Sequence, residues 1–395
     1  MEKEHELTLH ARWWTYRRQR LGRAASSLEE ALHDVMGVYS SHPSAPLSLW
    51  ARTVSFSPDA FRRLEREKRA FRVPAMRRSI FLMGCDDAAT AFAAAPISHE
   101  QNMGRLRYQA RYYSYDTFSV EAYPRLKAAI VAAATEPLTP NQLRKRIDEN
   151  VEDIAMLART VAYEGELLRV GSDSLRSNSL RYVSTSAWGA RLHDERDSNK
   201  ALRALAHRYL YAFGPARVKD FQWWAGITVA HAAAALGTLN RVMLPDGSFL
   251  LADDLAAFEQ MTPLPADAIV ILPKWDSYTM GYAPDGHARF VSPEMQSRVY
   301  ASLRDGEGGD GLGVVLVAGR AVASWGSAFS GKCLDVKLDL FDQSALPHLP
   351  TIQARFEEIA TILDGATCSV SLLDPAGPSL VSSVLYSRRR KFNEA

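Results

Sequence analysis

The feature that most constrains the fold is an order of elements that occurs three times along the chain. In each occurrence, short helical segments are followed by two strand-like runs that a short turn joins. Helices followed by a two-stranded ribbon are typical of the winged helix, the helix-turn-helix variant whose hairpin lies along a DNA duplex. Sequence identity among the three units is poor, so the prediction depends on the order of elements. We therefore predict an α+β fold of tandem winged-helix (helix-turn-helix) domains.

The same order sets the predicted domain boundaries. Three winged helices are expected, at residues 1–115, 116–195 and 196–262. In the second unit, residues 150–171 are predicted to form one long helix that stops at a glycine. Beyond residue 263, strand-like runs predict a β-rich domain over 263–395, either a small β-barrel or a curled sheet. These runs, and the amphipathic helix among them, are residues 268–273, 287–292, 313–326, 332–341 and, for the helix, 351–366.

Composition and motifs exclude several classes of function. Lys and Arg number 47 against 45 acidic residues, so the net charge of +2 neither demands nor excludes a polyanionic partner. The start of the chain has no apolar signal-peptide core, and no run approaches the roughly 18 apolar residues of a membrane span, which predicts a cytoplasmic protein without a membrane partner. The chain has no HExxH, EF-hand, Walker A or GxSxG motif and no CxxC pair, and its ten histidines lack ligand spacing. We therefore expect no metal and no cofactor.

The stretch 26–52 contains the first candidate for chemistry. Ser26 and Ser27 each precede a glutamate by three residues, as in a capping box, and an apolar face with helical spacing then continues to Tyr39. Tyr39, Ser40, Ser41 and His42 follow one another where this face ends, before two prolines that forbid further helix. Such a cluster of hydroxyl and imidazole groups can hold a water molecule against a substrate. The alternative is an ordinary polar helix end.

Arginines accompany the predicted helices and hairpins. Residues 7–21 interleave Arg17 and Arg18 with aromatic residues, which suits a phosphate backbone. A surface helix with solvated arginines and core-filling aromatics explains the same pattern equally well. The predicted turn of the first hairpin carries Arg77 and Arg78. The second hairpin carries two more arginines, Arg176 and Arg181.

The sequence resembles a known family at this point. Its stretches GVYSSHPSAPLSLWAR, AMRRSIFLM, YLYAFGPARVKDFQWWAGIT, and ILPKWDSYTMGY with the later GVVLVAGRAVASW, are similar to the winged-helix DNA-binding family of AlkZ-like and YcaQ-like DNA glycosylases. The resemblance covers residues 36–326. It implies three tandem winged helices and a C-terminal β-domain, bent around DNA. Active members remove bulky or cross-linked N-alkylated purines, and some protect producers of DNA-alkylating natural products.

The resemblance also implies which residues are catalytic. Characterised members have a Gln-x-Gln or Gln-x-Asp motif, and the glycine and prolines shared with the family align its two positions with Tyr39 and Ser41. A related branch has His-x-Ser/Thr followed by Asp-Pro, where this chain has Tyr39 and His42 in place of the His and the Asp. An N-alkylated purine is already cationic and leaves without prior protonation. A hydroxyl pair could therefore position the attacking water while His42 accepts its proton.

The remaining expectations concern binding and the competing functions. Arg17, Arg18 and the four hairpin arginines are predicted phosphate contacts. The family's β-domain motif supplies Asp276, Tyr278 and Tyr282, which are expected to brace the lesion pocket, while Trp50 and Arg52 support the helix-end loop from behind.

The first functional interpretation is a monofunctional glycosylase for bulky N7- or N3-alkylated purines in repair or self-resistance. It would be a monomer acting on double-stranded DNA at the nucleoid. The second is a non-catalytic DNA-binding or lesion-recognition protein. A third, a role without DNA binding, has only the near-neutral charge in its favour.

Overall fold

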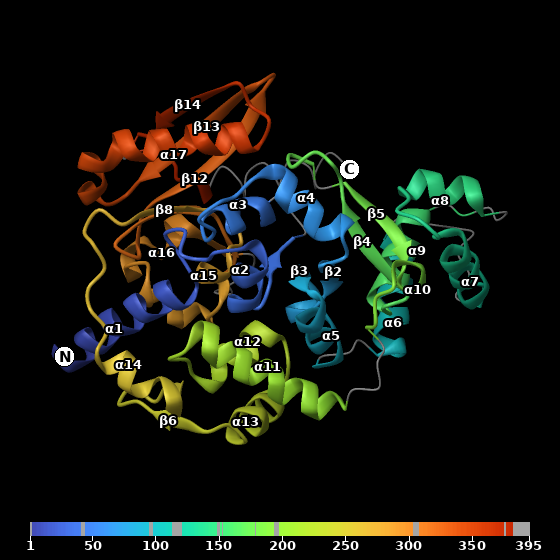
Figure 1. Ribbon diagram of the computed structural model, residues 1–395, viewed down its shortest axis with the longest axis horizontal. Coiled ribbons are helices and arrows are strands. Elements are labelled where there is room, and N and C mark those ends of the chain that lie inside the picture. The colour runs from blue at the N-terminus through green and yellow to red at the C-terminus, as the bar shows by residue number, and fades with distance from the viewer. Residues whose placement is uncertain are drawn as a thin grey trace.

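The structure is a computed structural model of the whole chain. It describes residues 2–40, 44–94, 98–112, 121–147, 151, 153–177, 179–192, 197–302, 308–374 and 377–381. Helices and strands are mixed throughout, which confirms the predicted α+β class. Figure 1 shows the C-terminal sheet above the N-terminal helices, with helices α11 to α13 below them and α7 to α9 at the far right.

The N-terminal part surrounds a short strand that follows α2. The hydroxyl of Ser27 accepts a hydrogen bond from the backbone of Glu30, as the capping pattern predicts. The elements of this part are α1 (Glu2–Arg18), α2 (Leu28–Asp34), β1 (Val38–Tyr39), α3 (Ala45–Trp50), α4 (Pro58–Arg66), β2 (Ala70–Pro74), β3 (Ile80–Gly84), α5 (Cys85–Ala94) and α6 (His99–Tyr112).

The next part contributes two strands to the same sheet. Its elements are α7 (Tyr123–Ala133), α8 (Pro140–Arg146), α9 (Ile154–Tyr163), β4 (Leu167–Gly171), β5 (Leu180–Ser184) and α10 (Thr185–Trp188). The sheet has the order β1-β3-β2-β4-β5, with Arg72 of β2 opposite Arg169 of β4 in an antiparallel pair. The first two hairpins are therefore joined in one sheet. Because β2 and β4 run in opposite directions, the β2–β3 turn and the β4–β5 turn lie at opposite ends of that sheet.

The third part has its own small hairpin. Its elements are α11 (Ser198–Phe213), α12 (Val218–Ala225), α13 (Val229–Gly237), β6 (Arg241–Met243), β7 (Phe249–Leu251) and α14 (Leu255–Glu259). The turn between β6 and β7 includes Gly247, whose φ of 78° favours glycine. The strands β6 and β7 pair only with each other among the described strands.

The C-terminal part is built on an open sheet. Its strands have the order β14-β13-β12-β11-β8, and none of the sheets that the structure describes closes into a barrel, so the barrel prediction is wrong. After β13 the chain crosses through α17 and returns as β14, parallel to β13, at the sheet edge far from β8. The elements are β8 (Ile269–Leu272), α15 (Ser277–Met280), α16 (Gln296–Val299), β9 (Tyr300–Ser302), β10 (Gly308–Gly311), β11 (Gly313–Val317), β12 (Arg320–Ser330), β13 (Cys333–Leu340), α17 (Leu349–Ile362) and β14 (Thr367–Leu372).

Three local predictions are also corrected. The apolar face predicted to stay helical as far as Tyr39 ends as a helix at Asp34, and its last residues form β1. The helix predicted over 150–171 ends at Tyr163, where Gly165 has a φ of 79° and the chain enters β4. Residues 287–292, predicted to form a strand, begin instead within a 3-10 helix. In the first two cases, pairing with a partner strand determines the structure of residues whose own pattern also fits a helix.

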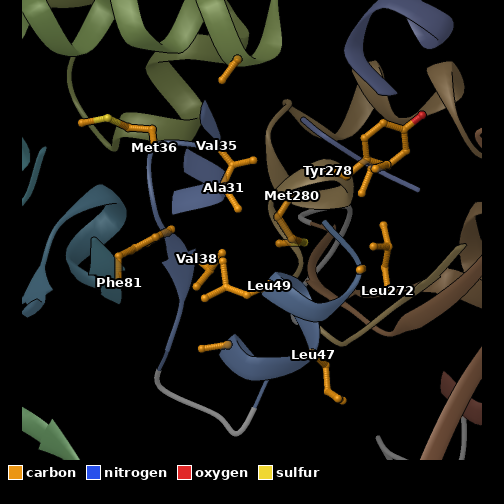
Figure 2. Packing of buried hydrophobic residues seen from close by; sticks show 14 of the residues in the cluster. Ala31, Val35, Met36, Val38, Leu47, Leu49, Phe81, Leu272, Tyr278 and Met280 are labelled. Carbon is orange, nitrogen blue, oxygen red and sulfur yellow. The ribbon is translucent and has the colours of Figure 1, made fainter. Parts of the chain in front are cut away.

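One hydrophobic core connects the N-terminal, third and C-terminal parts. Figure 2 shows Val38 and Leu49 between Phe81 on one side and Leu272 and Met280 on the other, and all five are buried. Helices α7 to α9 are packed around a second core of their own. The short strand β1 is therefore the edge of the first sheet that packs against the C-terminal part.

Candidate functional site

Tyr39, the first candidate catalytic residue, lies on β1 at the edge of the five-stranded sheet. It pairs with Phe81 of β3, and its ring is edge-on to Phe81 at 5.9 Å and to Trp275 at 4.9 Å between ring centroids. The side chain is half-buried, so part of it is accessible to a ligand. Ser41 and His42, the other two candidates, lie outside the described residues.

The backbone on both sides of Tyr39 is fixed by specific contacts. Gly37 has a φ of 83°, and a Cβ at this position would lie 2.6 Å from the Cγ of Met83, so only glycine fits. On the other side, the N–H of Ser40 donates to the Ile80 carbonyl at 2.8 Å. The buried Arg72 in turn donates to the Ser40 carbonyl at 3.2 Å. Strand β1 therefore ends in a defined position.

Arg77 lies close to Tyr39, in the β2–β3 turn. Arg77 and Arg78 both have left-handed backbone conformations, with φ of 51° and 59°. The Arg77 guanidinium lies 3.8 Å from the centroid of the Trp223 ring. Arg77 keeps some solvent-exposed surface, but the atoms packed around its guanidinium partly desolvate the charge and lower its pKa to about 10. The nearby Tyr39 has a smaller effect, which raises the pKa of Arg77.

A cleft of about 780 Å³ opens beside these arginines. Arg77 and Arg78 line one side, and the N-terminal ends of α11 and α13 line the other, together with His231. Among the described residues, neither arginine forms an ion pair with a carboxylate. Helix N-termini and unpaired guanidinium groups both favour an anion, so the cleft is suited to phosphate.

The other arginines predicted to contact DNA are engaged within the chain. Arg17 donates to the Thr262 carbonyl at 2.9 Å, and Arg18 pairs with Asp254. Arg176 donates to two carbonyls in the turn between α17 and β14, while Arg181 pairs with Asp173 at 3.1 Å. The structure gives these four side chains intramolecular partners. A phosphate contact by any of them stays a prediction.

The residues expected to brace the lesion pocket form a buried network. Arg52 donates to both carboxylate oxygens of Asp276, at 2.7 and 2.8 Å, and neither side chain has any exposed surface. Ser48 donates to the same carboxylate, and Gln19 accepts from Arg52, so the ion pair is largely satisfied.

The hydroxyl groups of Tyr278 and Tyr282 donate to the carbonyls of Gly319 and Phe213. Trp50 is buried under Arg23. The polar groups of Arg52, Asp276, Tyr278 and Tyr282 are therefore bonded within the chain in this conformation.

A buried histidine lies under the Arg77–Trp223 pair. The His287 ring stacks on Tyr300 at 3.8 Å and meets Trp223 edge-on at 6.4 Å. Burial lowers the pKa of His287 to about 4, so the imidazole is neutral at pH 7. Its Nε2 is buried and has no hydrogen-bond partner among the residues that the structure describes.

Comparison with known proteins assigns the family. The sequence pattern of the family described as DNA glycosylase AlkZ-like matches residues 33–360. The chain belongs to the AlkZ-like DNA glycosylase family. This confirms the resemblance seen in the sequence, and it makes DNA the substrate and DNA repair by a glycosylase the general function. No curated protein matches the chain.

A solved structure supports the fold assignment. The DNA glycosylase AlkZ of Streptomyces sahachiroi is similar with a TM-score of 0.68 at 17% sequence identity, over 92% of this chain and 98% of that one. At this identity the similarity shows the fold alone. Among the described residues, no group of His, Cys, Asp and Glu has the arrangement of a metal site, and no helix is long and apolar enough to cross a membrane.

Sequence reasoning missed three residues of this AlkZ-like site. Trp275 contacts Tyr39, Lys274 lies 4.2 Å over the Trp275 ring, and Trp223 lies under Arg77. All three belong to stretches that carry the family resemblance, PKWD and FQWW. The only signal in the sequence was that these three residues are neighbours of motif residues in the chain. The tertiary contacts show that they lie close to Tyr39 and Arg77.

Proposed function

We propose that the protein is a monofunctional DNA glycosylase that hydrolyses the N-glycosidic bond of bulky N7- or N3-alkylated purines. The role would be repair, or self-resistance to DNA-alkylating natural products. The observation that carries the proposal is the position of Tyr39. This first motif residue lies at an accessible sheet edge, in contact with an aromatic ring from the C-terminal part. It is also close to Arg77, which has no ion-pair partner among the described residues.

The chemistry suits a cationic leaving group. The oxygen of a water molecule bonds to C1′ of the sugar, the C1′–N bond breaks, and its electron pair neutralises the charge of the alkylated base. The proton lost by the water goes to His42 or to solvent. The Tyr39 hydroxyl, with that of Ser41, would hold this water. General-base assistance is typically worth about 10²- to 10⁴-fold, so a modest base suffices for a labile adduct.

The same arrangement argues against uncharged bases as substrates. Their departure needs protonation or strong stabilisation of the positive charge that develops on the sugar. Asp276 follows Trp275 in the chain, but its carboxylate is buried and bound by Arg52 and Ser48. It is therefore not available to the substrate, and the proposed activity is restricted to charged N-alkylated purines.

A second candidate function is recognition of damaged DNA without cleavage. It is favoured by the motif positions themselves, because Tyr39 and Ser41 replace the amide and carboxylate side chains of the characterised glycosylases. The DNA-binding cleft at Arg77 and Arg78 would serve both functions. The two differ only in whether a bond is broken.

The test is an excision assay on a panel of duplexes, each with one bulky N7- or N3-alkylated purine. Abasic sites are revealed by alkaline strand cleavage, and an undamaged duplex of the same sequence is the control. The proposal predicts abasic sites in the alkylated duplexes alone. Tight binding of the alkylated duplexes without abasic sites would instead establish the second function.

A further inference from the structure

Helix α6 carries a stripe of polar, basic and aromatic side chains that begins at the cleft of the candidate site and continues along the helix. Gln101, Arg105, Tyr108 and Tyr112 follow one another at intervals of four, three and four residues, which places them on one side of the helix. Tyr108 is 68% exposed and Tyr112 is 56% exposed, and their rings stack with centroids 6.3 Å apart. We call these four residues the α6 stripe. Two exposed aromatic rings that stack on each other provide a surface on which a further planar ring can stack.

Three arginines of α6, Arg105, Arg107 and Arg111, make no ion pair among the described residues. The helix has one acidic residue, Glu100 in its first turn, and the segment 101–112 that follows has none. Charges that are left unpaired on one face favour an anionic partner.

The stripe is linked to the β2–β3 turn through Tyr163. Arg105 and Arg169 lie over the Tyr163 ring at 4.4 and 5.3 Å, and the Tyr163 hydroxyl donates to the Arg78 carbonyl. Arg169 is 7% exposed, and its Nε and Nη2 atoms have no hydrogen-bond partner within the described part of the chain. A buried guanidinium that has no counter-ion among these residues adds to the positive potential where α6 packs against α9 (Figure 1).

The stripe also continues the cleft of the candidate site. Gln101 lines that cleft together with Arg77 and Arg78. From Gln101 to Tyr112 the helix rises by about 16 Å, at about 1.5 Å per residue. This length corresponds to about five nucleotide steps at about 3.4 Å each. A DNA strand bound in the cleft could therefore run along α6.

We propose that the α6 stripe binds unpaired nucleotides of a DNA strand that extends from the cleft. Bases stack on Tyr108 and Tyr112, while the neighbouring arginines contact the phosphates. The inference rests on the proposed function, because extruding a damaged purine leaves bases unstacked beside it. A fully paired duplex could contact the arginines, but it would present no unstacked base to the rings of Tyr108 and Tyr112. The continuity with the arginine-lined cleft and the absence of acidic residues from the segment 101–112 favour DNA over a protein partner.

The test compares two double variants, Tyr108→Ala/Tyr112→Ala and the matched Tyr108→Phe/Tyr112→Phe. Fluorescence anisotropy measures their affinity for a labelled duplex, the same duplex with a short internal bubble of unpaired bases, and the single strand. The wild type should bind the bubble more tightly than the duplex. The alanine variant should lose about 5-fold or more in affinity for the bubble and for the single strand, with the duplex unchanged. The phenylalanine variant, which keeps the rings, should behave as the wild type.

The outcomes separate this inference from the proposed function. If the alanine variant keeps the wild-type affinity for the bubble, the inference is overturned. The same result is expected if the α6 stripe binds a protein in place of DNA. Equal thermal unfolding midpoints exclude misfolding as the cause of a loss. If the wild type excises alkylated purines and the alanine variant keeps its affinity for the bubble, only the inference about the α6 stripe is contradicted. A wild type that prefers the bubble yet forms no abasic site contradicts the glycosylase proposal alone.

Discussion

The β2–β3 turn and the β4–β5 turn lie at opposite ends of one sheet. The first contains Arg77 and Arg78, and the second contains Arg176, with Arg181 at the start of β5. In the first turn, Arg77 lies on the face of Trp223 beside an open cleft, and neither of its arginines has a carboxylate partner among the described residues. In the second, Arg176 donates to backbone carbonyls of the C-terminal part and lies 3.7 Å over the Phe329 ring. The first turn is open to a ligand, whereas the second is docked on its own chain.

The comparison shows what distinguishes a DNA contact from a structural arginine. Binding to phosphate gains free energy by releasing counterions from the DNA, and this gain is largest when the cation has no internal partner to give up. Both turns look alike in the sequence, as basic residues between two strand-like runs. The partner of each guanidinium, which depends on the tertiary fold, is what separates them.

The β2–β3 turn lies close to Tyr39, so the rate of base excision should depend on residues at this end of the sheet. The double variant Tyr39→Phe/Ser41→Ala should lower the single-turnover excision rate by about 10²- to 10⁴-fold, because the water loses both hydroxyl contacts. Duplex affinity should stay unchanged. The matched control, Tyr211→Phe, removes the hydroxyl of a half-buried tyrosine near the C-terminal end of α11 and should leave excision as it is. Cleavage retained by the double variant would place the catalytic site elsewhere.

Arginines with internal partners should matter for stability. The Asp276→Asn variant leaves Arg52 buried without its counter-charge, so the free energy of unfolding should fall by about 3–5 kcal/mol. Urea denaturation of the wild type and the variant measures the loss. The control is Asp59→Asn, because the Asp59 side chain is 61% exposed and pairs with Arg63 and Arg66 at the surface. This change should lower the free energy of unfolding by less than about 1 kcal/mol. Similar losses for the two variants would contradict the structural role of Arg52.

His287, packed against Trp223 beneath the open turn, should make stability depend on pH. Its pKa is lowered from 6.5 to about 4 in the folded protein, so between these values the unfolded chain binds the extra proton. The contribution is therefore present above pH 6.5 and is lost as the pH falls towards 4. From pH 7 to pH 5 the loss should reach about 2 kcal/mol.

The His287→Phe variant keeps an aromatic ring next to Tyr300 but cannot bind a proton. Its unfolding free energy should fall by about 2 kcal/mol less than that of the wild type over the same pH range. Denaturant titrations at pH 7 and pH 5 measure both proteins. Parallel pH profiles for the two proteins would show that His287 is not the group responsible.

Salt dependence compares the two turns directly. Each phosphate contact contributes about 0.9 to the slope of the logarithm of affinity against the logarithm of salt concentration. The variant Arg77→Gln/Arg78→Gln should lower this slope by about 1.8 on a duplex, whereas Arg176→Gln/Arg181→Gln should leave it unchanged. Titrations at several salt concentrations give both slopes. Equal decreases for the two variants would remove the distinction between open and docked turns.

Local signals in the sequence predicted several elements well. Ser27 caps α2, as the capping pattern indicated, and the β2–β3 turn falls at Arg77 and Arg78. The helix predicted over 351–366 is observed as α17. In each case the determining interactions lie within a few residues of one another, so the local pattern contains them.

Non-local pairing explains what the sequence did not predict. The residues before Tyr39 and those around Leu168 fit a helical face, yet both segments become strands because β3 and β5 offer them backbone partners. The joining of two hairpins through Arg72 and Arg169 is likewise a contact between residues far apart in the chain. For the site, the motif position of Tyr39 came from family resemblance. Its contact with Trp275 and its closeness to Arg77 came only from the tertiary structure.

The most direct test of the distinction between the two turns is amide hydrogen exchange with and without an alkylated duplex. The account predicts slower exchange in residues 75–79 and 226–231, which line the cleft, and no change in residues 172–177, in the docked turn. Slower exchange in residues 172–177 with none in the β2–β3 turn would contradict it.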